Sequence, residues 1–247
     1  MRRNGVWVLA LSVGLAVPAV FAGSQGSDVR LQAELQDKVY HTQVFKHGQV
    51  AVSYANGTAT LTGTVDNLGS KMDAERAARK VTGVAQVVNN IQVKADDVTP
   101  REMLERARKE VVTYYAYGIF DNLQLAAEGD RLVVSGQVTQ PFKKTDLGNI
   151  LARVRGVAAI ENHLEVLPVS HFDDDLRGSV ARAIYGSDTL FTYGNRALPP
   201  IHIIVKNGNV TLEGAVGTKL DRQLAEVTAR SAGLSFSVVN NLRVDRA

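Results

Sequence analysis

The chain has 247 residues, of which 45% are hydrophobic and 21% are charged, a composition typical of a globular protein rather than a disordered one. Its formal net charge is +3, but Arg2 and Arg3 lie in an N-terminal segment that resembles an export signal. Without residues 1–22 the chain has 26 basic and 25 acidic residues, so it lacks the basic surplus that binding to nucleic acid requires. We therefore expect no nucleic acid among its partners.

Residues 1–22 have the three parts of an export signal. A short basic start is followed by an apolar run from Gly5 to Val17, and Val20 and Ala22 suit cleavage after Ala22. The alternative is a retained membrane anchor, but the run is shorter than the roughly 20 apolar residues that span a bilayer. We expect an exported protein with no transmembrane segment after signal removal. Since the chain has no cysteine, it can carry neither a disulfide nor a lipid on an N-terminal cysteine.

Three copies of one sequence unit follow the signal. In each copy an alternating run closes on a glycine, a second glycine follows 20, 20 or 19 residues later, and a stretch containing asparagine completes the unit. The first glycines are 73 and 78 residues apart, a spacing that is too long for a solenoid repeat and suits a small domain. Six glycines are therefore expected to have structural roles: Gly63, Gly136, Gly214, Gly83, Gly156 and Gly233.

Each copy is predicted to contain a helix, two strands, a second helix and a third strand. The opening helix has apolar residues at helical spacing, such as Leu35 and Val39 in the first copy. The next two strands are joined by tight turns, and Asn56-Gly57 and Asn207-Gly208 favour two-residue hairpins. The fold class is therefore α+β, with three tandem αββαβ modules, each a three-stranded sheet covered on one face by two helices.

The predicted boundaries are residues 1–22 for the signal and 28–95, 100–168 and 172–245 for the three modules. Short polar links, including Gly23 to Ser27, restrict the modules to a compact or curved array.

The second helices and the free sheet faces predict how the third copy packs. Leu224 and Val227 are the apolar residues expected to face the third sheet. The opposite sheet face has threonines in the first copy, but Val133 in the second and His202 and Ile204 in the third, and this predicts packing of the later sheets on a neighbouring module.

The repeated unit resembles the BON domain (bacterial OsmY and nodulation). The closest match is the stretch from Lys206 to Val216, and Gly83 to Val93 also matches well, whereas the second copy departs at its Glu128-Gly129-Asp130 turn. The resemblance covers about residues 28–245. It implies an αββαβ fold, a location in the bacterial envelope, and association with phospholipid membranes or with envelope stress. It implies no catalytic residue.

No convergent set of nucleophile, base and orienting residue is evident, so we expect no enzymatic activity, no metal and no cofactor. A hydrolase with a site between modules would need a cleft with convergent carboxylates or histidines. Asp173, Asp174 and Asp175 precede the opening helix of the third copy. Three acids could hold a metal, but carboxylates are also favoured at a helix N-terminus, and we favour that interpretation.

Aromatic residues are concentrated at one end of every module. Phe45, Phe120 and Phe191 are expected to plug the open ends of their small cores. Adjacent helical residues cannot all face one core, so at least one of Tyr114, Tyr115 and Tyr117 should be exposed or lie at a module interface. Nine of the 13 aromatic residues after the signal belong to these ends: Tyr40, Phe45, Tyr114, Tyr115, Tyr117, Phe120, Tyr185, Phe191 and Tyr193.

Two hypotheses about function follow. In the first, an exported, periplasmic, non-enzymatic protein associates with anionic phospholipid, and in the second it is a scaffold that binds another envelope protein. A membrane contact would use amphipathic aromatics and basic residues. The candidate contact residues are Tyr114, Tyr115 and Tyr117, together with the basic group Lys71, Arg76, Arg79 and Lys80.

Overall fold

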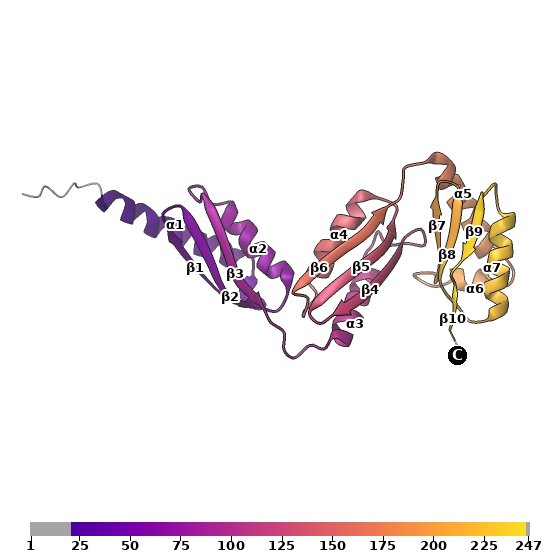
Figure 1. Ribbon diagram of the computed structural model, residues 1–247, viewed down its shortest axis with the longest axis horizontal. Helices are drawn as coiled ribbons and strands as arrows, with labels where there is room; N and C mark the ends of the chain where they lie inside the picture. The colour runs from indigo at the N-terminus through magenta and orange to yellow at the C-terminus, as the bar shows by residue number, and fades with distance from the viewer. Residues whose placement is uncertain (1–20, 246–247) are drawn as a thin grey trace, which may run out of the picture.

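The computed structural model describes residues 21–245, in which three αββαβ modules follow one another along the long axis of the molecule (Figure 1). Most of the predicted signal, residues 1–20, lies outside the described residues. Helix α1 (Phe21–His41) includes Gly23 to Ser27, so the expected polar link is helical instead. Extending an existing helix requires no new nucleation, and this offsets the weak helix propensity of glycine and serine.

The first module is a β1-β2-β3 sheet with two helices on one face (Figure 1). Strands β1 and β2 are antiparallel around the Asn56-Gly57 turn, and β3 pairs in parallel with β2. After α1, its elements are η1 (Val44–Lys46), β1 (Gly48–Ala55), β2 (Thr58–Val65), α2 (Leu68–Arg79) and β3 (Gln86–Val93).

The second module repeats this topology in a sheet of order β4-β5-β6. Its opening helix begins with a capping box, in which Thr99 and Glu102 satisfy each other's backbone amides. Its elements are α3 (Pro100–Thr113), β4 (Asn122–Glu128), β5 (Arg131–Val138), α4 (Pro141–Ala152) and β6 (Ala159–Val166).

The third module has the same order, but its last strand is divided. Both β9 and β10 pair in parallel with β8, so the predicted single strand is interrupted at residues 241–242. Its elements are α5 (His171–Tyr185), α6 (Phe191–Gly194), β7 (Ile201–Lys206), β8 (Asn209–Val216), α7 (Lys219–Ser231), β9 (Ser237–Asn240) and β10 (Arg243–Val244).

Each module has its own apolar core between its sheet and its helices. In the third module the buried residues of α7 are Ala225 and Ala229, whereas Val227 is exposed. The expectation for Val227 was wrong because α7 packs against its sheet through small residues, as α2 does through Ala74 and Ala78.

The first glycine of each copy lies where two backbones approach closely. Gly63, Gly136 and Gly214 have φ angles of 123°, 117° and 105°. A Cβ atom at these positions would lie about 2 Å from a backbone carbonyl oxygen, which belongs to the neighbouring strand at Gly63 and Gly136 and to Pro200, just before β7, at Gly214. Among the second glycines, Gly83 and Gly156 also have positive φ, whereas at Gly233 the space is limited by Leu176.

An asparagine in the third strand of each module fastens that strand to the second helix. The side chains of Asn89, Asn162 and Asn240 donate to backbone carbonyls of α2, α4 and α7 at 3.1, 3.0 and 2.8 Å. Each side-chain oxygen accepts the backbone N–H two residues later. The repeated asparagine therefore satisfies backbone groups at the same position in all three modules.

Candidate functional site at the module junctions

The first and second modules meet through a reciprocal pair of backbone hydrogen bonds. Leu68 N–H donates to the carbonyl of Val157 at 2.8 Å, and Gly156 N–H donates to the carbonyl of Asp66 at 2.9 Å. The segment that begins α2 thus lies against the loop between α4 and β6. Gly69 allows the approach, since a Cβ there would lie 2.6 Å from the Arg153 side chain.

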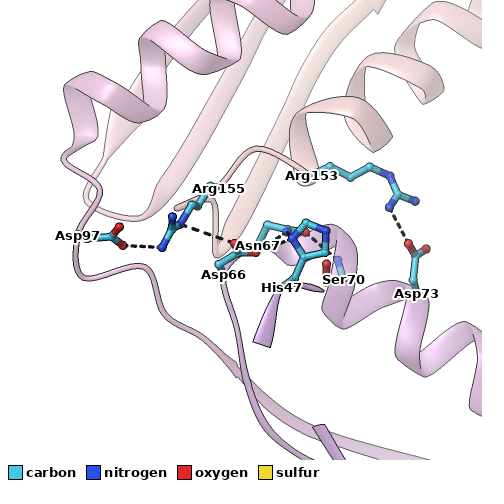
Figure 2. A network of polar contacts seen from close by, with 8 residues as sticks. All are labelled: His47, Asp66, Asn67, Ser70, Asp73, Asp97, Arg153 and Arg155. Carbon is cyan, nitrogen blue, oxygen red and sulfur yellow. Dashed lines mark hydrogen bonds and ion pairs between the residues drawn. The ribbon is translucent and has the colours of Figure 1, made fainter. Parts of the chain in front are cut away.

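Ion pairs surround these backbone bonds (Figure 2). Arg153 pairs with Asp73 at 2.7 Å, and Arg155 lies 2.9 Å from Asp97 and 3.6 Å from Asp66. The arginines are about half exposed, so each pair contributes roughly 0.2–1 kcal/mol, and salt weakens it. This junction therefore combines two backbone hydrogen bonds with partly exposed ion pairs.

The second and third modules meet through the loop before β4. Ile203 N–H on β7 donates to the carbonyl of Ile119 at 2.7 Å, and His202 Nδ1 donates to the carbonyl of Asp121 at 2.6 Å. Phe120, between these two carbonyls, packs against the core of the third module. The expectation that Phe120 plugs its own module was wrong, because the loop turns its ring toward the neighbouring sheet.

The burial of His202 and Ile204 confirms that the free face of the third sheet is covered.

A buried carboxylate holds this loop in place. Asp121 accepts hydrogen bonds from Lys143 Nζ at 2.7 Å, from the backbone amide and hydroxyl of Thr139, and from Gly118 N–H. Asp121 is fully buried and the Lys143 side chain is only 12% exposed. The pair therefore positions the loop whose carbonyls bind β7.

Burial also changes the proton affinities at this junction. Burial lowers the pKa of His202 because it disfavours the charged form of the ring. The hydrogen bond to the Asp121 carbonyl and the charges of Asp121 and Glu213 raise the pKa, but their effect is smaller. Burial, assisted by the charge of Asp121, raises the pKa of Tyr117 to about 12, and the Tyr117 ring lies 5.6 Å from the His202 ring. The junction is therefore built around a neutral imidazole.

We expect the chain to lose stability through His202 as the pH falls. Since the folded pKa of His202 lies below the unfolded value of about 6.5, the unfolded chain binds the extra proton below that pH. The free energy of unfolding should decrease by up to about 1.4 kcal/mol per pH unit from pH 6.5 down to the folded pKa. Urea unfolding of the wild type and of His202→Asn at pH 7.5 and 5.5 measures this, with His163→Asn, at an exposed histidine, as the control. Equal pH dependence in the wild type and His202→Asn would contradict it.

The three candidate tyrosines have different environments. Tyr114 is buried, and its hydroxyl donates to Asp146 on α4 at 2.8 Å. Tyr115 is 86% exposed, and Tyr117 lies at the junction with the third module. The expectation that at least one of them is exposed or at an interface is confirmed, and Tyr115 is the one that faces solvent.

The candidate basic group is partly neutralised by acids of its own helix. Arg76 and Arg79 each pair with an acid one turn earlier on α2, at 2.8 and 2.6 Å. Lys71 is half-buried, whereas Lys80 is exposed and forms no ion pair with any residue from 21 to 245. The free positive charge on this face is therefore smaller than the sequence suggests.

The other expected core plugs, Phe45 and Phe191, are each about half exposed. The Phe45 ring stacks on that of Tyr40 at 4.8 Å and so covers only part of the core end. That expectation was wrong for these two rings because Val44 and Leu190, the residues just before them, are the buried ones.

An apolar tip on the third module was not predicted. We define it as Phe172, Leu234 and Phe236, in which the two phenylalanine rings stack at 6.1 Å and Leu234 and Phe236 are 85% and 78% exposed. Phe236 N–H bonds to the hairpin turn, as the backbone amides of Ala85 and Ala158 do in the other modules. Because alanine serves at the equivalent positions, the fold does not require Phe236.

The acidic triplet has local partners. Ser170 caps α5, and Asp173, in its first turn, accepts hydrogen bonds from the Asn207 and Gly208 amides at 2.8 and 2.7 Å. Asp174 pairs with Arg177. Asp173 therefore binds the hairpin turn as well as lying at the helix N-terminus. No group of three or more histidines and acids between residues 21 and 245 is arranged to hold a metal.

No helix within residues 21–245 combines the length and apolar character needed to cross a bilayer.

Comparison with known proteins agrees with the repeat. A family model described as "BON domain" matches residues 27–95, 120–168 and 173–246, together more than half of the chain. The "uncharacterized protein in gshII 5'region" of Anaplasma centrale is 39% identical over 64 residues, which are 25% of this chain and 42% of that protein. The matched part thus spans less than half the length of this curated relative.

Two solved structures of CdsD, described as a structural protein of the Type III secretion system of Chlamydia trachomatis, align with the chain. Both alignments cover 86% of this chain and have a TM-score of 0.24. The first covers 98% of the CdsD chain at 15% identity, and the second covers 93% at 17% identity. A TM-score this low does not indicate a shared overall arrangement.

Proposed function

Because the chain belongs to the BON domain family, we propose that it is a non-enzymatic protein exported to the periplasm, whose modules associate with phospholipid membrane surfaces. BON domain proteins are in general non-enzymatic and bind lipids or proteins. The signal-like residues 1–22 support export. A role in osmotic or envelope stress protection is part of this proposal.

The exposed Tyr115 carries the proposal. Its ring lies beside that of Tyr114 at the end of α3, with ring centroids 5.1 Å apart. Phe142, also exposed, lies one helical turn before Asp146, the partner of Tyr114, and so extends the same end of the module. Tyrosine suits the boundary between headgroups and acyl chains because its ring is apolar and its hydroxyl is polar.

Basic residues on the first module would assist binding to anionic lipid. Lys80 has no acidic partner within the described chain, and a lysine near an anionic surface contributes about 1 kcal/mol. Arg76 and Arg79 contribute less because they are already paired. Contact would therefore be weak, reversible and sensitive to salt.

Vesicle flotation of the mature chain tests this function. At low salt the wild type should float with vesicles that contain anionic phosphatidylglycerol, and the variant Tyr115→Ser with Lys80→Gln should float at least about threefold less. The matched control is Tyr54→Phe, which removes a hydroxyl bonded to Gly83 in the first module and leaves Tyr115 intact. If the wild type does not float with these vesicles at low salt, the proposed association with lipid is wrong.

The apolar tip favours a second candidate function, a scaffold that binds another envelope protein. Asp174 and Asp175 follow Phe172 in the first turns of α5. These acids disfavour contact with anionic lipid and suit a protein partner with a basic rim around an apolar pocket. Crosslinking in intact cells before extraction distinguishes the two functions, since a scaffold should yield one discrete adduct that Phe236→Ala abolishes.

A further inference from the structure

A polar cleft lies between the second and third modules. It encloses about 440 Å³, a size within the range of small-molecule sites. One wall is formed by α3 and the free edge of β4, and the other by β7, β8 and the segment that leads into β10. Because both modules contribute to it, the cleft exists only when the second and third modules are in contact.

Two arginines with no partner face this cleft from opposite modules. Arg108 comes from α3 and Arg243 from β10, and the guanidinium group of neither forms a hydrogen bond or ion pair with any residue from 21 to 245. Several other arginines of these two modules are paired, as Arg131 is with Glu161 at 2.6 Å and Arg230 is with Glu226 at 2.9 Å. The unpaired guanidinium groups give the cleft a positive character that the fold does not use.

The remaining lining can form hydrogen bonds but offers little compensating charge. Glu213 is the only acid of the lining, and its carboxylate already accepts a hydrogen bond from Asn241 at 2.7 Å. The side chain of Gln124 is exposed, and that of Asn122 is buried in the lining. Since His202 is held neutral by burial, the formal charge of the lining is +1.

We propose that this cleft binds a small polar molecule that carries a phosphate group and hydroxyls. Guanidinium groups bind phosphate oxygens through paired N–H donors, and a phosphate offers enough oxygens for two arginines, whereas a carboxylate offers only two. The amide side chains of Asn122 and Gln124 suit hydroxyl groups. The phosphate can belong to a free molecule or to a lipid headgroup. A bound ligand links two modules and so stabilises their junction, which goes beyond the proposed surface association.

Titration of the mature chain with glycerol 1-phosphate tests the site. At low salt we expect saturable binding by calorimetry and a rise in the unfolding temperature, because a ligand that binds only the folded chain stabilises it. The double variant Arg108→Gln with Arg243→Gln should weaken binding at least about tenfold, which is about 1.4 kcal/mol. Arg30→Gln, at an exposed arginine of α1 outside the cleft, is the matched control and should leave binding unchanged. Circular dichroism verifies that each variant is folded.

Flotation with phosphatidylglycerol vesicles, measured on the same variants, shows whether the phosphate belongs to a lipid headgroup or to a free molecule. Loss of both glycerol 1-phosphate binding and flotation in the double arginine variant supports the cleft with a lipid headgroup as its ligand. Loss of glycerol 1-phosphate binding alone supports the cleft with a free ligand. Absence of glycerol 1-phosphate binding in the wild type, or binding that is equal in the wild type and the double variant, overturns the site. If the site is overturned in this way but flotation still depends on Tyr115 and Lys80, the proposed function stands without the cleft.

Discussion

Gly136→Ala is expected to lower the free energy of unfolding of the second module by about 4 kcal/mol or more. Its φ angle of 117° is one that residues with a Cβ rarely adopt. In addition, the new methyl group would lie 2.0 Å from the carbonyl oxygen of Asn122, which is backbone and cannot rotate away. Small domains are stable by only about 5–15 kcal/mol, so the variant should unfold this module or nearly so.

Thermal and urea unfolding followed by circular dichroism measures this effect. Gly118→Ala is the matched control in the same module, since a Cβ there meets no atom within 4 Å and its φ is not in the left-handed region. It should change stability by less than about 0.5 kcal/mol. If both variants unfolded at the same urea concentration, the close approach at Gly136 would not matter to the fold. Because Gly63 and Gly214 have the same geometry, they should respond as Gly136 does.

Features that occur in all three modules were predictable from the sequence. The glycine positions were found by their repetition, because each copy needs the same close approach of two backbones. The hairpin turns and the opening helices were predictable for the same reason, although the turn is Asn-Gly only in the first and third modules. The repeated asparagines were noticed as landmarks, but their role in fastening the third strand to the second helix requires side-chain geometry.

The sequence predicted that the face of the third sheet with His202 and Ile204 is covered, but not which contacts form the junctions. Those contacts were not predictable because each junction uses residues that occur in only one copy. Leu68 and Pro141 are both the first residue of a second helix, but proline has no N–H and cannot repeat the bond that Leu68 makes to Val157. The second junction therefore uses a different surface, the loop of Asp121. Differences between copies, rather than their similarities, were the signal available for these contacts and for Phe236, which replaces an alanine of the other copies.

The cleft was missed for a related reason. Arg108 and Arg243 are 135 residues apart in the chain and come from non-equivalent elements, so no spacing rule relates them. Composition gave no signal either, because paired and unpaired arginines look the same in a sequence. Only the geometry shows that both face one cleft without a partner among the described residues.

Asp121→Ala is expected to lower the free energy of unfolding by about 3–5 kcal/mol and to loosen the junction between the second and third modules. Removing the carboxylate leaves the nearly buried ammonium of Lys143 without its charged partner, and it also leaves the amides of Gly118 and Thr139 unsatisfied. Asp97→Ala is the matched control, since its carboxylate is 63% exposed and pairs with Arg155 on the surface. It should cost less than about 1 kcal/mol.

The variant Lys143→Met separates the charge of Lys143 from the loop geometry. If the unpaired ammonium dominates the cost, Asp121→Ala with Lys143→Met should recover at least about 1 kcal/mol relative to Asp121→Ala alone. Hydrogen exchange then reports the junction, because Ile203 N–H is protected by the carbonyl of Ile119. In the double variant the Ile203 amide should still exchange faster than in the wild type, while Val134 in the core of the second module stays protected. Unchanged protection of Ile203 would mean that Asp121 stabilises its own module without positioning the loop, and the junction would then depend on Phe120 and His202.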